Sequence, residues 1–320
     1  MKDPRDLDTA DYEFPAVTVP LHPPVPFSSL VKIDFGACTN MGNVRKNNED
    51  AYLICRTGRY WERLHTNLGE SELPDRFDEN GYAMAVADGM GGAVGGEIAS
   101  SMTLRLCVSL TLNAAKWALK LDNPETRDYE IQKTMERCEA YFRKVDQLLT
   151  QQVDANPWLK GMGTTLTGAY STGDDLFVIQ IGDSRAYLSR RGHLQRLTHD
   201  HTVAQLLADM GDITPDQVAT HQLRHTLTSS LGGREGKVKI DVQHLQLIQD
   251  DRLLLCSDGL TEMVRDEIIA EVMSKDLPAQ TICQELVDRA LQAGGEDNVT
   301  VAMARYSIPP RPKQTSSHLF

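Results

Sequence analysis

Three features that would each place a protein in a broad class are missing from this sequence. There is no excess of basic charge: 33 lysines and arginines stand against 45 acidic residues, and the formal net charge at pH 7 is −12. Because a surface that binds a nucleic-acid backbone is basic, we do not expect nucleic acid as a partner. There is no paired cysteine motif either, since the six cysteines occur singly, and this excludes a zinc site of the usual spacing.

The third missing feature is a segment suited to cross a membrane. Residues 14–31 form an uncharged run of 18, but five of them are prolines, which remove backbone donors and prevent a regular helix. No apolar signal segment follows Met1. We therefore expect a cytoplasmic protein without membrane contact. Its parts would be an extended, proline-rich leader over residues 1–28, one domain over 29–306 and a flexible tail over 307–320.

What the sequence does contain is a regular apolar pattern. Between residues 131 and 149 apolar side chains recur at alternating spacings of four and three, which predicts one face of a long helix. A second long helix is expected over 97–121, and a third begins near Pro278. Short apolar segments predict strands at 32–38, 51–55, 82–87, 164–170, 176–181, 185–189, 238–246, 252–257 and 299–305. Strands in runs and helices in pairs favour an α+β fold with mostly antiparallel sheets.

Aspartates stand at the ends of several predicted strands. Asp50 directly precedes one strand and Asp88 directly follows another. Because antiparallel neighbours bring the start of one strand beside the end of the next, both carboxylates would reach the same edge. Asp183 and Asp258 also follow strands, and Asp297 precedes one. One acid at a strand end is ordinary turn chemistry, whereas five suggest a common purpose.

Clustered carboxylates repel one another and stay ionised only if a cation compensates their charge. Oxygen ligands without histidine or cysteine favour Mg²⁺ or Mn²⁺. Two such ions about 3.5–4 Å apart can acidify a bridging water and hold the oxygens of an in-line displacement. Arg45, five residues before Asp50, is the kind of bidentate donor that a phosphate dianion requires. The pattern therefore indicates metal-assisted hydrolysis of a phosphate ester.

Six short blocks carry a resemblance to a known family. They are RKNNED (45–50), ADGMGG (87–92), GTTL (163–166), GDSRAY (182–187), SDGL (257–260) and DNVT (297–300). In this order they resemble the PP2C family of metal-dependent protein serine/threonine phosphatases, and most closely its bacterial stand-alone members. The resemblance runs from about residue 31 to residue 306 and implies two stacked antiparallel sheets flanked by helix pairs.

The resemblance also assigns roles to the acids. Asp88 would bridge two catalytic ions, and the Gly89 carbonyl would bind the second. Asp258 and Asp297 would hold the first ion, while Asp50 and Glu49 would act largely through waters. With Asp258, Asp183 matches a third-ion position of bacterial relatives. Arg45, Asp88 and Asp258 would be the catalytic residues, with the phosphate on Arg45.

The mechanism that the resemblance implies is direct attack by a bridging water or hydroxide, without a phosphoenzyme. The substrates would be phosphoserine and phosphothreonine on proteins, and the enzyme, a monomer, would oppose a serine/threonine kinase in signalling. One residue departs from the pattern. Many members have a histidine, a proposed general acid, where this chain has Met90. The leaving group must then be protonated from another source.

Two segments have less certain roles. Residues 198–233 correspond to the mobile flap segment of the family, and within them His201 is our candidate for substrate contact, although a structural role is commoner for such histidines. The stretch 55–81 looks longer than the usual hairpin connection. We interpret it as a solvated loop, with partner binding as the alternative.

Two other functions, an esterase and a pseudophosphatase, fit the sequence less well than a phosphatase. Ser184 resembles the nucleophile block of GDS-type esterases, with Asp241 and His244 as partners, but those two lie three residues apart on a predicted strand and so on opposite faces. A pseudophosphatase that only binds phosphoproteins would be expected to have lost metal ligands, and this chain keeps all of them.

Overall fold

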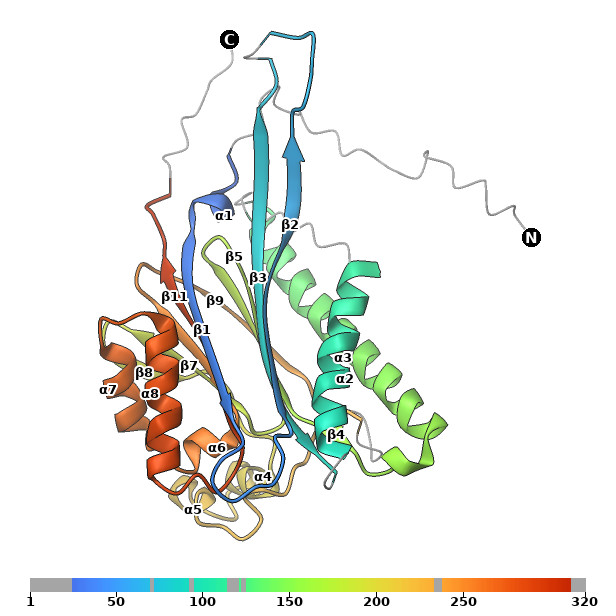
Figure 1. Ribbon diagram of the computed structural model, residues 1–320, viewed down its shortest axis with the longest axis vertical. Coiled ribbons are helices and arrows are strands. Elements are labelled where there is room, and N and C mark those ends of the chain that lie inside the picture. The colour runs from blue at the N-terminus through green and yellow to red at the C-terminus, as the bar shows by residue number, and fades with distance from the viewer. Residues whose placement is uncertain are drawn as a thin grey trace, which may run out of the picture.

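Two antiparallel β-sheets are stacked face to face between two layers of helices (Figure 1). The computed structural model describes residues 25–69, 72–91, 95–113, 121, 125–232 and 238–311. One sheet has the strand order β1 (Lys32–Asn40), β11 (Val299–Ser307), β10 (Arg252–Cys256), β7 (Arg185–Arg190) and β8 (His193–Arg196). The other has the order β2 (Asp50–Glu62), β3 (Arg76–Met90), β5 (Leu166–Thr172), β6 (Asp175–Ile181) and β9 (Asp241–Gln246), with the short β4 (Gly163–Thr164) paired to β3. The predicted α+β class and sheet type are confirmed.

Each sheet has a pair of long helices on its outer face. Helices α2 (Gly95–Asn113) and α3 (Arg127–Ala155) cover the β2-containing sheet, and α7 (Asp266–Ser274) and α8 (Ala279–Gln292) cover the other. Shorter helices are α1 (Phe27–Leu30), η2 (Pro157–Leu159), α4 (Val203–Met210), α5 (Pro215–Val218) and α6 (Asp258–Thr261). No helix in the described part of the chain is both long and apolar enough to span a membrane.

The apolar strands are buried on both faces, which explains their continuous hydrophobic sequence. In β10, Leu253 and Leu255 pack into the core between the sheets, whereas Leu254 and Cys256 pack against α7 and α8. Burying such a side chain contributes about 1.5–3 kcal/mol. All six cysteines are free.

The predicted helix faces are confirmed where the structure describes them. Cys138, Val145 and Leu149 of α3 are buried against the sheet. Helix α8 begins directly after Pro278 and buries the predicted stripe of 282, 286 and 290. The predicted second helix, 97–121, is described to residue 113, and its residues 114–120 lie outside the described part.

The stretch 55–81 is not the solvated loop that we expected. Strands β2 and β3 continue as a hairpin arm, paired in register from Cys55 opposite Ala83 to Glu62 opposite Arg76. The arm projects beyond the end of the sandwich (Figure 1). Charged side chains pair across the two strands of the arm: Nε of Arg59 lies 2.5 Å from Oε2 of Glu79.

The chain ends next to the domain are packed where they are described. Phe27 of α1 is buried, and the guanidinium of Arg311 lies 4.8 Å from the centre of its ring. Arg311 is also paired with Asp174 through Nε at 3.1 Å. Residues 1–24 and 312–320 lie outside the described part, so the leader and the tail remain predictions.

Helix α8 approaches strand β1 so closely that it requires glycine at position 36. A Cβ on Gly36 would lie 2.4 Å from backbone atoms of Ala279 and Gln280. We expect Gly36→Ala to lower the free energy of unfolding by about 1–3 kcal/mol, because the helix must shift. Gly168→Ala is the matched control: a Cβ there meets nothing nearer than 3.6 Å. Urea denaturation would measure both, and equal stabilities would contradict this account of the packing.

Candidate active site

The predicted shared edge of β2 and β3 is present. Asp50, the first residue of β2, stands opposite Asp88, near the end of β3. The turn after β4 fixes the end of β3: the Thr165 backbone N–H donates to the Asp88 carbonyl at 2.9 Å, and the Asp88 N–H donates to Oγ1 of Thr165 at 3.1 Å. The backbone at Asp88 is therefore held on both its donor and its acceptor side.

The second sheet brings its acids to the same edge. Asp258 begins α6 just after β10, and Asp297 lies just before β11. Ser257 joins the two sheets there, because its hydroxyl donates to Oδ2 of Asp50 at 2.7 Å and accepts the Thr300 N–H at 3.0 Å. The link brings Asp50 of one sheet beside the end of β10 in the other sheet, where Asp258 follows.

Asn298 holds the loop that carries Arg45 and Glu49. Its Oδ1 accepts the Glu49 backbone N–H at 2.8 Å, and its amide donates to the carbonyls of Met41 and Asn47. Sequence reasoning assigned no role to Asn298 or Ser257. Each stands beside a predicted metal-binding acid, in the blocks SDGL (257–260) and DNVT (297–300), and only this position in the sequence could have indicated a role.

The acids interact strongly with one another. Burial raises the pKa of Asp50 to about 7, and the charges of Asp258 and Asp297 add to the shift. Burial also raises the pKa of Asp88 well above its usual range, and repulsion from the other four acids adds to it. For Asp183 the same two causes apply, with Asp258 as the first charged neighbour. Burial also raises the pKa of Asp258, and repulsion from Asp297 adds to the shift, as expected where like charges lie close together.

The donor set fits a divalent cation, although the side chains are not gathered around one. Among the described residues, no three Asp, Glu, His or Cys side chains are arranged to hold a metal ion. Asp297 is instead paired with Arg45, and one oxygen of Asp50 with Ser257. The other oxygen of Asp50, Oδ1, is buried without a hydrogen-bond partner. A buried, unpartnered carboxylate oxygen among oxygen donors suits Mg²⁺ or Mn²⁺.

Two glycines allow α2 to begin against these acids. A Cβ on Gly89 would lie 2.0 Å from the Gly96 carbonyl oxygen, and a Cβ on Gly96 would lie 2.3 Å from Oε2 of Glu49. The Gly89 N–H donates to the Glu49 carbonyl at 3.2 Å. Glu49 and Gly89, both predicted ligands, are therefore packed together at the start of the helix.

Arg45 lies at the solvent side of the acids. Its side chain is 55% exposed, and Nη2 lies 2.5 Å from Oδ2 of Asp297. An anion arriving from solvent meets a guanidinium that is held in place by a carboxylate.

A cavity of about 180 Å³ lies beside Asp183 and Asp258 and is partly lined by the segment 198–233. From this segment His225 reaches the acids, with Nδ1 3.8 Å from Oδ2 of Asp258. Arg224 lies next to it, with Nε 3.5 Å from Oε2 of Glu262. Neither residue was singled out from the sequence, because only the fold brings the segment over the acids.

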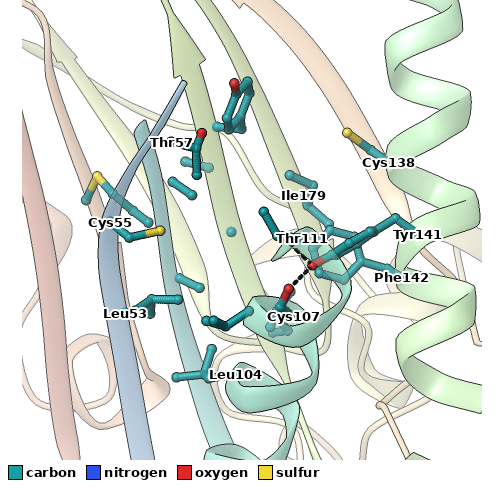
Figure 2. A pocket seen from close by; sticks show the side chains of 18 of the residues that line it. Leu53, Cys55, Thr57, Leu104, Cys107, Thr111, Cys138, Tyr141, Phe142 and Ile179 are labelled. Carbon is teal, nitrogen blue, oxygen red and sulfur yellow. Dashed lines mark hydrogen bonds between the residues drawn. The ribbon is translucent and has the colours of Figure 1, made fainter. Parts of the chain in front are cut away.

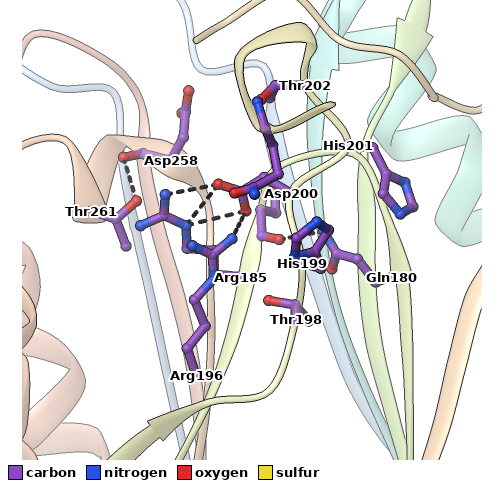
Figure 3. Close-up of polar contacts among 12 residues, drawn as sticks. Gln180, Arg185, Arg196, Thr198, His199, Asp200, His201, Thr202, Asp258 and Thr261 are labelled. Carbon is purple, nitrogen blue, oxygen red and sulfur yellow. Dashed lines mark hydrogen bonds and ion pairs between the residues drawn. The ribbon is translucent and has the colours of Figure 1, made fainter. Parts of the chain in front are cut away.

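His201 does not face this cavity. Its side chain is wholly buried, Nδ1 accepts the Gly182 N–H at 3.2 Å, and Nε2 lies 2.9 Å from Oδ2 of Asp241. In Figure 3 the ring lies apart from Asp258. Burial lowers the pKa of the imidazole. The ring ties the start of the segment to β9 and to the turn before Asp183. This placement is structural and speaks against the substrate contact that we predicted.

A buried ion-pair cluster anchors the same segment (Figure 3). Asp200 is buried and accepts from Arg185, with Nη2 2.8 Å from Oδ2, and it is also paired with Arg196. Two residues later Thr202 caps α4 by accepting the Gln205 N–H at 3.2 Å. The segment is thus fixed at its first residues, next to Asp183.

The esterase alternative has no geometric basis. Ser184 is fully buried, and its hydroxyl lies 2.8 Å from Oγ1 of Thr165. Asp241 is paired with His201, and Nε2 of His244 lies 2.7 Å from Oδ1 of Asp175. The three residues of the supposed triad therefore have three separate sets of partners.

Comparisons with known proteins agree with the geometry. A family profile described as Protein phosphatase 2C matches residues 75–296. The serine/threonine protein phosphatase PstP of Mycobacterium tuberculosis strain H37Rv is 35% identical over 246 residues, which are 77% of this chain and 44% of PstP. The chain thus spans less than half of that relative.

A shorter relative matches over nearly its whole length. The serine/threonine phosphatase stp of Listeria monocytogenes serotype 4b is 31% identical over 278 residues, which are 87% of this chain and 98% of stp. Among solved structures, the catalytic domain of PstP in complex with two manganese ions has a TM-score of 0.65 and 31% identity, covering 87% of this chain and 99% of that one.

Mn²⁺ should stabilise the protein against heat, because only the folded chain brings the acids together. We expect millimolar Mn²⁺ to raise Tm by about 5 °C or more relative to the protein in EDTA. Differential scanning calorimetry would measure the shift. A Tm that does not respond to Mn²⁺ or Mg²⁺ would contradict a metal site.

Without metal, stability should fall as the pH rises through the neutral range. The pKa of Asp50 is raised from 3.8 to about 7 in the folded protein, so between these values the folded state holds more protons than the unfolded chain. Asp50→Asn should therefore be more stable than wild type at pH 8 in EDTA, by up to about 4 kcal/mol, and similar to it at pH 4. Urea denaturation would test this, with exposed Asp276→Asn as the control. A loss of stability at pH 8 would show that Asp50 is not electrostatically strained.

Proposed function

The chain belongs to the protein phosphatase 2C family, and from this premise we propose that it hydrolyses phosphoserine and phosphothreonine on proteins. One observation carries the proposal: acids from both sheets, with raised pKa values, surround one edge beside an exposed arginine. Relatives that the chain covers almost completely bear the name serine/threonine phosphatase.

We propose two catalytic Mn²⁺ or Mg²⁺ ions as cofactors. Asp88 and the Gly89 carbonyl, together with Asp258 and Asp297, would hold them, and Glu49 and Asp50 would act through waters. Asp183, next to Asp258, would serve a third ion. Such ions, when bound, lower the pKa of a coordinated water and offset the negative charge of the phosphoryl oxygens. A structure of the PstP catalytic domain with two manganese ions supports this choice.

The chain's own residues would bind and orient the substrate. Arg45 offers a planar guanidinium to the phosphate dianion, which competes with Asp297 for its N–H groups. The segment 198–233, anchored through Asp200 and His201, would place Arg224 and His225 over the cavity where the phosphopeptide lies. Met90 carries no transferable proton, so the proton for the leaving group comes from elsewhere.

The remaining parts of the proposal concern the cell. We propose a cytoplasmic monomer that opposes a serine/threonine kinase in signalling. Because the net charge of the chain is −12, we do not expect it to bind nucleic acid. The alternative, a pseudophosphatase that binds phosphoproteins without hydrolysing them, would leave the acids without a catalytic use.

Removing one of the acids should abolish turnover. With Mn²⁺ and a phosphothreonine peptide, Asp258→Asn should lower kcat by at least about 100-fold, because the lost charge weakens stabilisation of the transition state. Asp276→Asn, an exposed aspartate paired with Arg305 at 2.6 Å, is the control and should keep full activity. Phosphate release would measure both. Activity without divalent metal, or an unimpaired Asp258→Asn, would contradict the metal mechanism, and binding without hydrolysis by the wild type would favour the pseudophosphatase.

Arg45 should act mainly in binding the phosphate. Arg45→Ala should raise KM for the phosphopeptide by about tenfold or more, because a charge-assisted bidentate contact is lost. Arg59 on the hairpin arm offers a close control: it is 58% exposed and its Nε lies 2.5 Å from Oε2 of Glu79. If Arg59→Ala changed KM as much as Arg45→Ala, the effect would be one of general charge and the assignment of Arg45 would be wrong.

A further inference from the structure

The loop that carries Arg45 runs from residue 41 to residue 49, between β1 and β2. It packs directly against the loop between α8 and β11, which carries Asp297. The contact is so close that it requires glycine at position 42, where φ is +81°. A Cβ on Gly42 would lie 2.3 Å from the Asp297 carbonyl oxygen and 2.7 Å from the Gly295 carbonyl oxygen. The position of one loop therefore depends on the position of the other.

Asn43 fastens these two loops together. Its backbone N–H donates to the Gly295 carbonyl at 2.7 Å. Its side-chain amide donates to the carbonyls of Leu291 and Gly294, each at 2.9 Å. These carbonyls lie at or just beyond the C-terminal end of α8, where backbone C=O groups have no partner within the helix. Asn43 thus satisfies them and ties the Arg45 loop to a helix that is buried against the β1-containing sheet.

Arg45 lies two residues beyond this anchor. Asn298 holds the loop on either side of Arg45, because its amide donates to the carbonyls of Met41 and Asn47 at 2.8 and 2.9 Å. Asn43 is nearer to Arg45 than Met41 is, and it is held by a different element, the end of α8. Because the backbone is fixed at residues 43 and 47, the Cα atom of Arg45 can move little.

The side chain of Arg45 needs such an anchor, because Asp297 cannot hold it once the site is in use. The side chain is 55% exposed, and Nη2 lies 2.5 Å from Oδ2 of Asp297. Asp297 is a proposed metal ligand and Arg45 is the proposed phosphate ligand, so each would leave the other for its own partner. A bidentate contact with phosphate nevertheless requires a guanidinium that is placed to within about 1 Å.

We propose that Asn43 is a positioning residue for Arg45. By bonding to the carbonyls at the end of α8, it holds the backbone of Arg45 at the place from which the guanidinium reaches the phosphate. Asn43 acts through Arg45 and does not itself bind the phosphate. The proposal rests on the proposed function, because it concerns the residue that we expect to bind the substrate. Without the anchor, Arg45 occupies the binding position for only part of the time, and the apparent affinity falls by that fraction.

The first measurement is the hydrolysis of a phosphothreonine peptide in the presence of Mn²⁺. Asn43→Ala removes both side-chain bonds to the end of α8. It should raise KM about fivefold and keep kcat within about twofold of wild type, because only the placement of Arg45 is lost. Asn43→Leu, which keeps the size of the side chain but not its donors, should behave in the same way. Circular dichroism would confirm that both variants are folded.

Asn156 offers a matched control. It follows the C-terminal end of α3, and Nδ2 donates to the Gln152 carbonyl at 2.9 Å, much as the Asn43 amide does at α8. Because α3 packs on the other sheet, Asn156→Ala removes the same kind of contact away from Arg45. This variant should have the KM and the kcat of wild type.

A double variant shows whether Asn43 acts through Arg45. In the Arg45→Ala background, Asn43→Ala should raise KM no further, because no guanidinium is left to position. A second rise of the same size would show that Asn43 affects binding independently of Arg45, and it would overturn the proposal.

A further readout needs neither metal nor turnover. Amide hydrogen exchange over residues 41–49, measured in EDTA, should be about tenfold faster in Asn43→Ala, because the loop opens more often from the end of α8. Asn156→Ala should exchange there as wild type does. Unchanged exchange in Asn43→Ala would show that the side chain does not anchor the loop, and this too would overturn the proposal.

The outcomes separate this proposal from the proposed function. If the wild type hydrolyses the peptide and Arg45→Ala raises KM, but Asn43→Ala and Asn43→Leu do not, only the role of Asn43 is overturned. A wild type that does not hydrolyse the peptide would overturn the proposed function and the role of Asn43 with it.

Discussion

The repulsion among buried carboxylates at one edge of the sandwich is the constraint on which the rest of this structure depends. Asp50 and Asp88 are brought together by strand register, and Asp258 is brought to them by the other sheet through the Ser257 bridge. Such an arrangement costs free energy unless a cation offsets it. The burial of apolar side chains in the core offsets this cost. Two sheets and two helix layers cover both faces of the central strands there.

The parts around the acids serve to hold them in place. Asn298 fixes the loop of Arg45 and Glu49, the turn at Thr165 fixes the backbone of Asp88, and glycines at 89 and 96 allow α2 to start beside them. The segment 198–233 is held near its start by the buried polar contacts of Asp200 and His201, and near its end by Leu231, which is buried in the core beside α3. Strands and short helices thus carry the acids, and the segment 198–233 borders the cavity beside them.

The strands and the shared edge of Asp50 and Asp88 could be predicted from the sequence, because they depend on short stretches of neighbouring residues. Apolar runs gave the strands, and the position of Asp50 and Asp88 relative to those runs gave their shared edge. The hairpin arm could not be predicted, because its strands are stabilised by cross-strand partners such as Arg59 and Glu79, 20 residues apart in the sequence. The burial of His201 could not be predicted either, because it depends on Asp241, 40 residues away. The cavity between the β2-containing sheet and helices α2 and α3 (Figure 2) depends on the distance between these elements, which no sequence pattern reports.

The central claim is that the carboxylates of both sheets form one cation site. Crystals grown with Mn²⁺ and measured near the manganese absorption edge would test it most directly. We expect strong anomalous peaks between Asp88 and Asp258, with the side chain of Asp297 turned from Arg45 toward the metal. Crystals that contain manganese only elsewhere on the surface, with Asp297 still paired with Arg45, would contradict it.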